Sequence, residues 1–417
     1  MSDELKRFGE SKQFKERAAE EQYTIIVGPQ HPHTHEPLSY RFALEGEYIA
    51  CTDAVIGYNH RGIEKGMENR NYLQNLYIVE RICGICSAGH QGTYVQVCDQ
   101  LGEIQKEVPE RAHYIRSIIA ELERIHSHIL WYSILGHDAG FDTFFMITWR
   151  DREIVMDLLE LISGNRVNYA MYQPGGVSRD IPKEMHAKIK TDLAELRKKV
   201  EYHYEVVETS RTFRGRLEDV AKVSKEDALK LGCSGPTLRG CGVEFDIRKD
   251  APYFAYKELP LKVCTWPEGD VLATTLVRLD ETLNAIDMIL AALDKMPGGD
   301  VKVKFPKRPP PNEAVARSEV PRGTCIHYGI SDGTDKPYRW RIRAPTYNNI
   351  PTALYRLIGQ NIADIPVGIR AMDPCYSCTD RMMFVDLNSG KKKIVTGEVL
   401  VHLANRGRLT KRNLFNL

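Results

Sequence analysis

The chain has 417 residues, with 57 basic and 56 acidic side chains and a formal net charge of +1. That balance excludes a nucleic-acid-binding field spread over the whole chain. Ten cysteines are too few for a disulfide scaffold and favour a reducing, cytoplasmic compartment. No apolar run reaches the roughly 18 residues that a membrane span needs. We therefore expect a soluble chain with one large domain or two closely merged ones.

The first part of the chain predicts a charged N-terminal arm and small β elements. The arm covers residues 1–22, which lack the apolar core of a signal peptide. Tyr23–Val27 predicts a strand that ends at Gly28 and Pro29, and alternation over Tyr40–Thr52 predicts a second strand. The loop between them has three alternating histidines, which we interpret as solvated side chains rather than metal ligands.

Long helices dominate the middle of the chain. A helix through Tyr72, Leu73 and Leu76 leads to the first cysteine pair. Apolar residues at helical spacing predict four longer helices. The first starts at Pro109, and the other three cover about Phe144–Ile162, Met185–Val206 and Leu272–Leu293. Helices with one apolar stripe pack together as bundles. We assign these stripes to the core and to no cofactor.

The last third predicts short strands and one more helix. Residues 307–311 are a proline-rich extended connector. Gly323–Tyr328 and Tyr338–Ile342 predict strands, and a helix starts within Thr352–Leu357. The predicted fold class is α+β, mainly α, with a central bundle of long helices and small β elements at the ends.

Two Cys-x-x-Cys pairs, Cys83 with Cys86 and Cys375 with Cys378, lie at opposite ends of the chain. Thiolates at this spacing chelate a soft metal from one side, so two pairs predict a four-thiolate site. A structural zinc site is the common alternative, although zinc pairs usually enclose a loop of about 15–20 residues. A redox disulfide is another alternative, and it needs only one pair. We expect the other cysteines to be buried free thiols.

The residues around both pairs resemble the signature motifs of [NiFe]-hydrogenase large subunits. Arg81 and His90 flank the first pair, and Asp373 precedes the second. Further matching segments are Gly28–Pro32, His60–Lys65, Pro174–Val177, Gly235–Gly240, Ser331–Gly333 and Tyr338–Pro345. Together they resemble the branch shared by energy-converting, membrane-bound [NiFe] hydrogenases and the quinone-site large subunit of respiratory complex I. The complex I homologue lacks the four cysteines and a sulfane-reductase branch departs from the full set, which favours a hydrogenase.

The resemblance implies a role for each cysteine of the two pairs. Cys83 and Cys375 would bind nickel terminally, whereas Cys86 and Cys378 would bridge nickel to an iron that carries CO and cyanide. A terminal thiolate, with Cys375 favoured, would take the first proton. Four thiolates close together repel strongly unless cations neutralise them, so we expect the metal-free site to be less ordered than the loaded one.

Four further residues take roles from the same resemblance. Glu36 would relay protons, or would only cap a turn. Arg322 would donate to a cyanide nitrogen beside a dry wall at Pro321, or would be a surface ion-pair partner. His90 would orient its neighbours, or would be a core histidine with satisfied hydrogen bonds.

Glu64 matches a glutamate that binds magnesium or iron in some relatives. Those relatives have a histidine three residues after the last cysteine, and this chain has Arg381 there. A guanidinium cannot ligate a metal, so the cation site is in doubt. In the alternative interpretation, Glu64 forms an ion pair with Arg381. The domain would cover residues 23–381, and the tail 382–417 is a segment that a maturation endopeptidase would remove.

The implied function is that of a ferredoxin-linked hydrogenase large subunit that reduces protons to H2 or runs in reverse. The sequence has no iron–sulfur motif, so electrons would pass through a small subunit with a [4Fe-4S] cluster. Membrane-arm partners would hold the chain on the cytoplasmic side of the membrane and couple the reaction to ion translocation. The alternatives are a subunit of a formate-linked or sulfur-reducing complex, or a complex I-like coupling subunit without hydrogenase activity.

Overall fold

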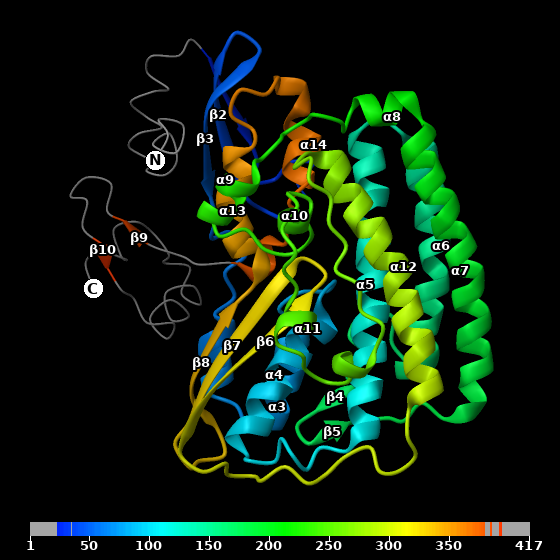
Figure 1. Ribbon diagram of the computed structural model, residues 1–417. Coiled ribbons are helices and arrows are strands. Elements are labelled where there is room, and N and C mark those ends of the chain that lie inside the picture. Colours follow the sequence, from blue (N-terminus) through cyan, green and yellow to red (C-terminus); the bar gives the residue numbers. More distant parts are fainter. Residues whose placement is uncertain (1–22, 35, 380–383, 386–391, 394–417) are drawn as a thin grey trace.

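A computed structural model describes residues 23–34, 36–379, 384–385 and 392–393. A bundle of long helices stands beside a layer of shorter helices and two three-stranded sheets (Figure 1). The predicted α+β fold class, mainly α, is therefore confirmed. The predicted arm 1–22 and most of the predicted tail 382–417 lie outside the described residues.

Four long helices form the bundle: α5 (Glu110–Asp138), α6 (Asp142–Ser163), α7 (Lys183–Thr209) and α12 (Val271–Lys295). The periodicity predicted all four. Helix α5 is buried around most of its circumference because α4, α6 and α12 pack on it. Helix α7 buries a single stripe and lies at the outer edge of the bundle (Figure 1).

Three shorter helices lead to the first cysteine pair and away from it. They are α2 (Ile63–Glu68), α3 (Tyr72–Glu80) and α4 (Ser87–Leu101). Helix α3 starts with a capping box, in which Asn71 and Gln74 each accept the other's backbone N–H. Helix α4 was not predicted. It is buried between α5, β6 and β7, so its sequence has no polar face to reveal the helical period.

The N-terminal sheet has the order β1 (Tyr23–Val27), β2 (Ser39–Glu45), β3 (Tyr48–Val55), with antiparallel neighbours. The prediction of a single strand over Tyr40–Thr52 is wrong, because the chain reverses at Gly46, where φ is +62°. Glycine adopts this left-handed conformation without the Cβ clash that other residues suffer.

The second sheet consists of β6 (Asn312–Val320), β7 (Gly323–Ser331) and β8 (Pro337–Arg343). Both predicted strands are present, whereas β6 was missed. The register pairs Val320 with Gly323, which leaves Pro321 and Arg322 as a two-residue turn between β6 and β7. This turn points Arg322 toward the second cysteine motif.

The chain then passes through α13 (Pro345–Tyr355), η3 (Ile362–Asp364), α14 (Ile365–Arg370) and η4 (Tyr376–Cys378). Helix α13 starts earlier than predicted, with Pro345 in its first turn. The remaining elements are β4 (Tyr172–Gln173), β5 (Gly176–Val177), α8 (Arg211–Gly215), α9 (Lys225–Lys230), α10 (Pro236–Arg239), α11 (Ile247–Asp250), η2 (Tyr256–Glu258), β9 (Phe384–Val385) and β10 (Lys392–Lys393). Within the described residues, no helix is long and apolar enough to cross a membrane.

Buried ion pairs join the bundle to the second sheet. Arg239 on α10 donates to Glu281 of α12 at 2.6 Å and to Glu319 of β6 at 2.8 Å. Arg248 contacts Glu121 of α5 at 3.1 Å. Buried carboxylates and guanidiniums need such partners, because removing one leaves an uncompensated charge that costs about 3–5 kcal/mol. The network therefore holds β6, and the turn that follows it, in a defined position against the helices.

Candidate metal centre

The first cysteine pair lies in the loop between α3 and α4. The backbone N–H groups of Ile85 and Cys86 both donate to the Cys83 sulfur at 3.3 Å. Cys86 is the N-cap residue of α4, with its side chain buried. The loop thus directs both sulfurs into the interior, as the Cys-x-x-Cys spacing predicts.

The second pair reaches the same place from the other end of the chain. The Cys375 sulfur lies 3.2 Å from the Cys83 sulfur and 2.9 Å from the Cys378 sulfur. The sulfurs of Cys83, Cys375 and Cys378 lie within 4.8 Å of one another. Cys86 is beside them, since its backbone N–H donates to the Cys83 sulfur and its own sulfur accepts from Arg322. All four side chains are buried. Sulfur atoms this close form the donor set of a soft metal centre.

Burial makes this sulfur cluster sensitive to charge. Hydrogen bonds from Cys375, Cys378 and Cys86 lower the pKa of the Cys83 thiol well below its ordinary value. Donation to Cys83, together with burial, raises the pKa of Cys86, and burial raises the pKa of Cys378. One negative charge is thus stabilised, whereas further ionisation is opposed until cations neutralise it.

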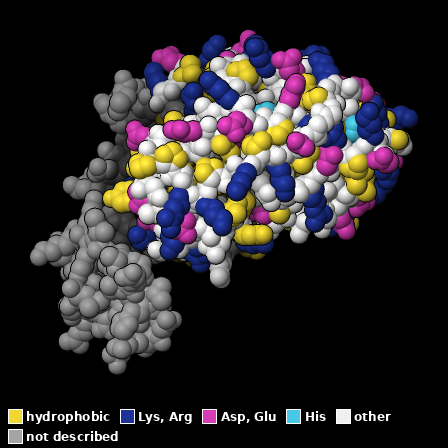
Figure 2. Space-filling view, turned by 90° about the horizontal axis from the view of Figure 1, so that it is seen from below, with side chains coloured by type: hydrophobic (Ala, Val, Ile, Leu, Met, Phe, Trp, Pro, Cys, Tyr) yellow, Lys and Arg dark blue, Asp and Glu magenta, His cyan; other side chains and the backbone are white. Residues whose placement is uncertain are grey.

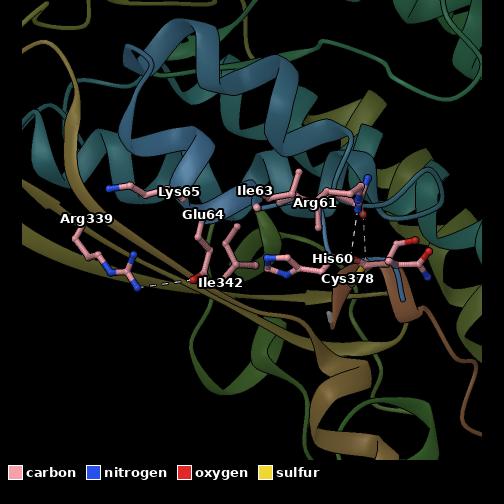
Figure 3. A pocket seen from close by; sticks show the side chains of 12 residues that line it. His60, Arg61, Ile63, Glu64, Lys65, Arg339, Ile342 and Cys378 are labelled. Carbon is pink, nitrogen blue, oxygen red and sulfur yellow. Dashed lines mark hydrogen bonds and ion pairs between the residues drawn. The ribbon is translucent and has the colours of Figure 1, made fainter. Parts of the chain in front are cut away.

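Arg61, just before α2, ties the two cysteine loops together. Its guanidinium donates to the carbonyls of Arg81 and Ile82 at 2.7 and 2.8 Å and to that of Ser377 at 3.2 Å. Figure 3 shows Arg61 with its bonds to Ile82 and Ser377 beside Cys378. They border a cavity of about 180 Å³ that reaches Cys378. The side chain therefore fixes the spacing of the two loops at the edge of the site.

Arg322 lies over the cluster from the turn between β6 and β7. It donates to the Cys86 sulfur at 3.1 Å, to Ser127 Oγ at 3.3 Å and to Asp373 Oδ1 at 2.7 Å. Burial opposes its charge, but Asp373 and the thiols raise the pKa of Arg322 well above its ordinary value. The guanidinium is buried, so the alternative of a surface ion pair is wrong.

Glu36 lies against the second cysteine loop. Ser377, between the two cysteines, donates its N–H and its hydroxyl to Glu36 at 2.8 and 2.5 Å. Burial and the negative charge of Cys83 raise the pKa of Glu36, and the two Ser377 bonds counteract part of the rise. The carboxyl group is thus next to the sulfur cluster and holds its proton more readily than an exposed glutamate.

The loop that contains Glu36 is anchored by a buried ion pair. Arg370 on α14 donates to Asp138 at 2.6 Å and to the His33 carbonyl at 3.2 Å. The His33 ring lies 3.2 Å from Asp138, so the prediction that this histidine is solvated is wrong. Residue 35 lies outside the described residues.

Glu64 faces two arginines of β8. Its carboxylate accepts the N–H of Ile342 at 3.0 Å and lies 3.5 Å from Arg341. Arg339 lies 3.9 Å from the same carboxylate (Figure 3). Two guanidiniums lie near the Glu64 carboxylate, and neither offers the oxygen donors that a hard cation needs. The described residues therefore do not fit a magnesium site, and Arg381 lies outside them.

His90 is on α4 and faces β7. Its Nδ1 lies 3.2 Å from His327 Nε2 and 3.6 Å from the Cys325 sulfur, so these three buried residues are a second group of possible metal ligands. The Trp340 indole donates to His327 Nδ1 at 3.3 Å. Because Nδ1 of a neutral His327 accepts this bond, the ring has its proton on Nε2 and donates it to His90. A histidine that binds a metal through one ring nitrogen usually donates a hydrogen bond from the other, and here Nδ1 accepts one instead. We interpret this group as a chain of hydrogen bonds.

Glu123 of α5 is a buried carboxyl group beside the cysteine loop. It accepts the N–H groups of Ala88 and Gly89 at 2.6 and 2.7 Å. Burial raises its pKa from 4.5 to about 8. A cavity of about 10 Å³, room for about one water molecule, separates this carboxyl from the wall formed by Val320 and Pro321. Within the described residues, no cation pairs with Glu123.

Several of these residues were not identified from the sequence. Asp373, Arg61 and Ser377 stand in the recognised motifs without an assigned role, and Ser127 had no signal at all. Their roles arise from contacts between distant segments. The four buried thiols, the overlying guanidinium and the nearby carboxyl group fit a nickel–iron centre with small anionic ligands.

Comparison with known families agrees with this geometry. Residues 138–309 and 306–381 match the family described as "Respiratory-chain NADH dehydrogenase, 49 Kd subunit". Residues 61–139 match "Nickel-dependent hydrogenase". The chain belongs to the family that unites [NiFe]-hydrogenase large subunits with the 49 kDa subunit of complex I.

Within that family, the chain is a large subunit of the membrane-bound hydrogenase type. It is 42% identical to the membrane-bound hydrogenase subunit alpha of Pyrococcus furiosus, over 91% of this chain and 92% of the relative. It is 36% identical to formate hydrogenlyase subunit 5 of Escherichia coli, over 89% of this chain and 65% of the relative. A chain of the archaeal membrane-bound sulfane sulfur reductase matches with a TM-score of 0.82 at 33% identity, over 87% of this chain and 99% of that one.

Proposed function

We propose that this chain is the catalytic subunit of an energy-converting [NiFe] hydrogenase. The proposal depends on one observation, the convergence of Cys83, Cys86, Cys375 and Cys378 in a buried cluster. Two further contacts support a reactive centre over a structural zinc site: Arg322 donates to a cluster sulfur, and Glu36 bonds to the loop between two ligands. A structural zinc site needs neither contact.

The four thiols divide the binding of the metals. Cys83 and Cys375 would hold nickel, and Cys86 and Cys378 would hold both nickel and an iron with CO and cyanide. When bound, this group supplies the redox chemistry that splits H2 heterolytically or forms it from protons and electrons. The Cys375 sulfur holds the proton and exchanges it with Glu36. The raised pKa of Glu36 brings that carboxyl closer to the pH at which general acids and bases are effective.

Arg322 and Pro321 shape the other side of the centre. The Arg322 guanidinium is held in orientation by Asp373 and Ser127, and it would donate to a cyanide nitrogen on the iron. Pro321 and the neighbouring Val320 form an apolar wall. A centre enclosed in this way excludes water, which strengthens each electrostatic contact inside it.

Partners complete the reaction. Electrons come from ferredoxin through a small subunit with a [4Fe-4S] cluster, and membrane-arm subunits hold the assembly at the cytoplasmic face of the membrane and translocate ions. The names of the relatives support this assignment, since one is a subunit of a membrane-bound hydrogenase and another is part of a membrane-bound reductase.

A second candidate is a sulfur-reducing subunit of the same architecture, favoured by the likeness to the sulfane sulfur reductase chain. The two candidates are distinguished by the metals and by the substrate. We expect the native assembly to contain nickel and iron near one each at this site, with infrared bands of CO and cyanide, and to exchange H2 with solvent protons. Cys375→Ser should abolish that exchange. Zinc alone, or polysulfide reduction without H2 exchange, would contradict the proposal.

A further inference from the structure

The segment 301–308 crosses the lower end of the molecule between α12 and β6 (Figure 1). It contains Lys302, Lys304, Lys307 and Arg308 and no acidic residue. Within the described residues, none of these four cations forms an ion pair or a side-chain hydrogen bond. Figure 2 views this end and shows basic side chains interspersed with apolar ones. An unpaired basic stretch attracts acidic groups.

Residues 301–303 of the segment are extended and run antiparallel to the β4–β5 hairpin, so one edge is occupied there. Val177 donates to the Val301 carbonyl at 3.0 Å, and Val303 donates to the Gly175 carbonyl at 2.9 Å. Gly176 pairs with Lys302 between these bonds. The two glycines are needed here, since a Cβ on Gly175 or Gly176 would lie 2.5 or 2.2 Å from a carbonyl oxygen of the segment.

The other edge is open. Successive residues of a strand direct their backbone groups to opposite edges, so the N–H and C=O groups of Lys302 and Lys304 face away from the β4–β5 hairpin. The described structure gives these groups no hydrogen-bond partner. Side-chain exposure alternates in the same register, with Lys302 and Lys304 exposed and Val301, Val303 and Phe305 partly buried. Phe305 anchors the strand by edge-on packing against Tyr72, with the rings 5.6 Å apart.

A cavity of about 700 Å³ borders this strand, and the start of α3 lines it as well. Leu73 is 55% exposed there. The hydroxyl of Tyr72, in contrast, is buried and has no hydrogen-bond partner in the described part of the chain. Asp335 is the one acidic residue in the lining, against three lysines. The cavity is at the far end of α4 from the cysteines, roughly 20 Å away at 1.5 Å per residue.

We propose that this edge binds an extended acidic segment of a partner subunit, which adds as a strand beside residues 301–305. The segment supplies both donors and acceptors to the free backbone groups, as in strand addition, and its carboxylates meet the lysines. An apolar side chain of the segment covers Leu73. A phosphate or a lipid headgroup offers acceptors to the lysines but no row of donors for the carbonyls, so a peptide fits better.

Lysines on an open strand edge can instead protect a protein against unwanted strand pairing. Hydrogen exchange in the native assembly distinguishes this protective role from binding of a partner strand. We expect the amides of Lys302 and Lys304 to exchange at least about tenfold more slowly than unpaired loop amides. The amide of Val303, already bonded to Gly175, is the internal reference. Exchange of Lys302 and Lys304 at the rate of a free loop would overturn the proposal.

Cross-linking and charge reversal identify the occupant. A photoreactive residue in place of Lys304 should cross-link, in the native assembly, to an acidic extended segment of another subunit. Lys302→Glu with Lys304→Glu should weaken retention of that subunit about tenfold without changing nickel and iron content. Lys198→Glu with Lys257→Glu is the matched control on other exposed surfaces. Cross-links to lipid or to a second copy of the chain, or full retention by the double variant, would contradict the proposal.

Discussion

Buried carboxyl groups near the cluster differ in their partners, and the difference predicts what each can do. Asp373 and Glu281 face arginines, and ion pairs of this kind hold a carboxylate in place. Glu36 and Glu123 are bonded to backbone N–H and hydroxyl groups, and burial raises the pKa of both. A carboxyl with a raised pKa exchanges its proton nearer to neutral pH, so these two residues are the protonatable acids beside the sulfurs.

Glu36→Gln tests the proton path at the scale of one residue. The amide keeps the shape of the side chain but has no acidic proton to give or to take up near neutral pH. We expect the rate of exchange between D2 and solvent protons to fall about 10²–10⁴-fold, the contribution typical of a positioned acid or base, with nickel and iron content unchanged. Glu47→Gln, in the exposed β2–β3 turn, should exchange as the wild type does. A normal rate in Glu36→Gln would remove the residue from the relay.

Glu123 predicts a pH dependence of stability. The folded chain binds a proton at Glu123 up to pH about 8, whereas the unfolded chain releases it near 4.5. Stability therefore falls as pH rises through this window. Glu123→Gln has no carboxyl proton to lose, so its stability does not fall for this reason. Between pH 5 and pH 8, the unfolding free energy of the wild type should fall by about 1–4 kcal/mol more than that of the variant.

Urea unfolding of the metal-free chain at the two pH values measures this difference. Glu201→Gln, on the exposed face of α7, is the control and should track the wild type. Parallel pH profiles of wild type and Glu123→Gln would show that the carboxyl does not retain its proton in the folded chain.

Among the elements, the short helix α10 positions the turn that presents Arg322. Gly235, its N-cap, has φ of +71°, and a Cβ there would lie 2.5 Å from the Arg322 carbonyl oxygen and from Gly323 Cα. Gly232 has nearly the same φ, +70°, with no atom within 4 Å of its Cβ position. Both glycines have positive φ, but Gly235 also has ψ of −153°, which is a conformation that is essentially restricted to glycine. Of the two, only Gly235 also has a packing requirement.

Alanine at each glycine compares the two positions. Gly232→Ala should lose roughly 1–2 kcal/mol of stability from the left-handed backbone alone. Gly235→Ala should lose about 1–3 kcal/mol more, because overpacking adds to a more strained backbone, and it should retain less nickel because Arg322 shifts. Urea midpoints and metal analysis measure both effects. Equal losses in the two variants would show that the turn yields without strain.

At the scale of the whole molecule, the metal centre joins the two ends of the fold. The first pair follows α3, and the second follows α14, with the entire helical bundle between them in the sequence. A ligand that binds only the folded chain stabilises it by mass action. Four thiols that repel one another when ionised should hold the two loops less firmly without metal.

We expect the amides around Cys83 and Cys375 to exchange faster in the metal-free chain than in the loaded one, by about tenfold or more. Amides in the centre of α5, buried on several sides, should exchange equally in both states. Hydrogen exchange by mass spectrometry makes the comparison. Equal protection of the two cysteine loops in both states would show that the fold alone organises the site.

The sequence by itself determined the features that depend on local spacing. Apolar stripes at helical period predicted α5, α6, α7 and α12, because side chains three and four residues apart lie on one face of a helix. This signal depends on local spacing alone, and α5 has it although it is buried around most of its circumference. The Cys-x-x-Cys spacing predicted two chelating pairs, because the ligands of one pair are neighbours in the chain.

The tertiary structure decided what depends on contacts between distant segments. Helix α4 has no polar face because neighbours cover it on several sides. The partners of Glu64, the bonds of Arg61 to both cysteine loops and the contact of Ser127 with Arg322 join residues far apart in sequence. No local period encodes such pairs, since packing of whole elements brings them together.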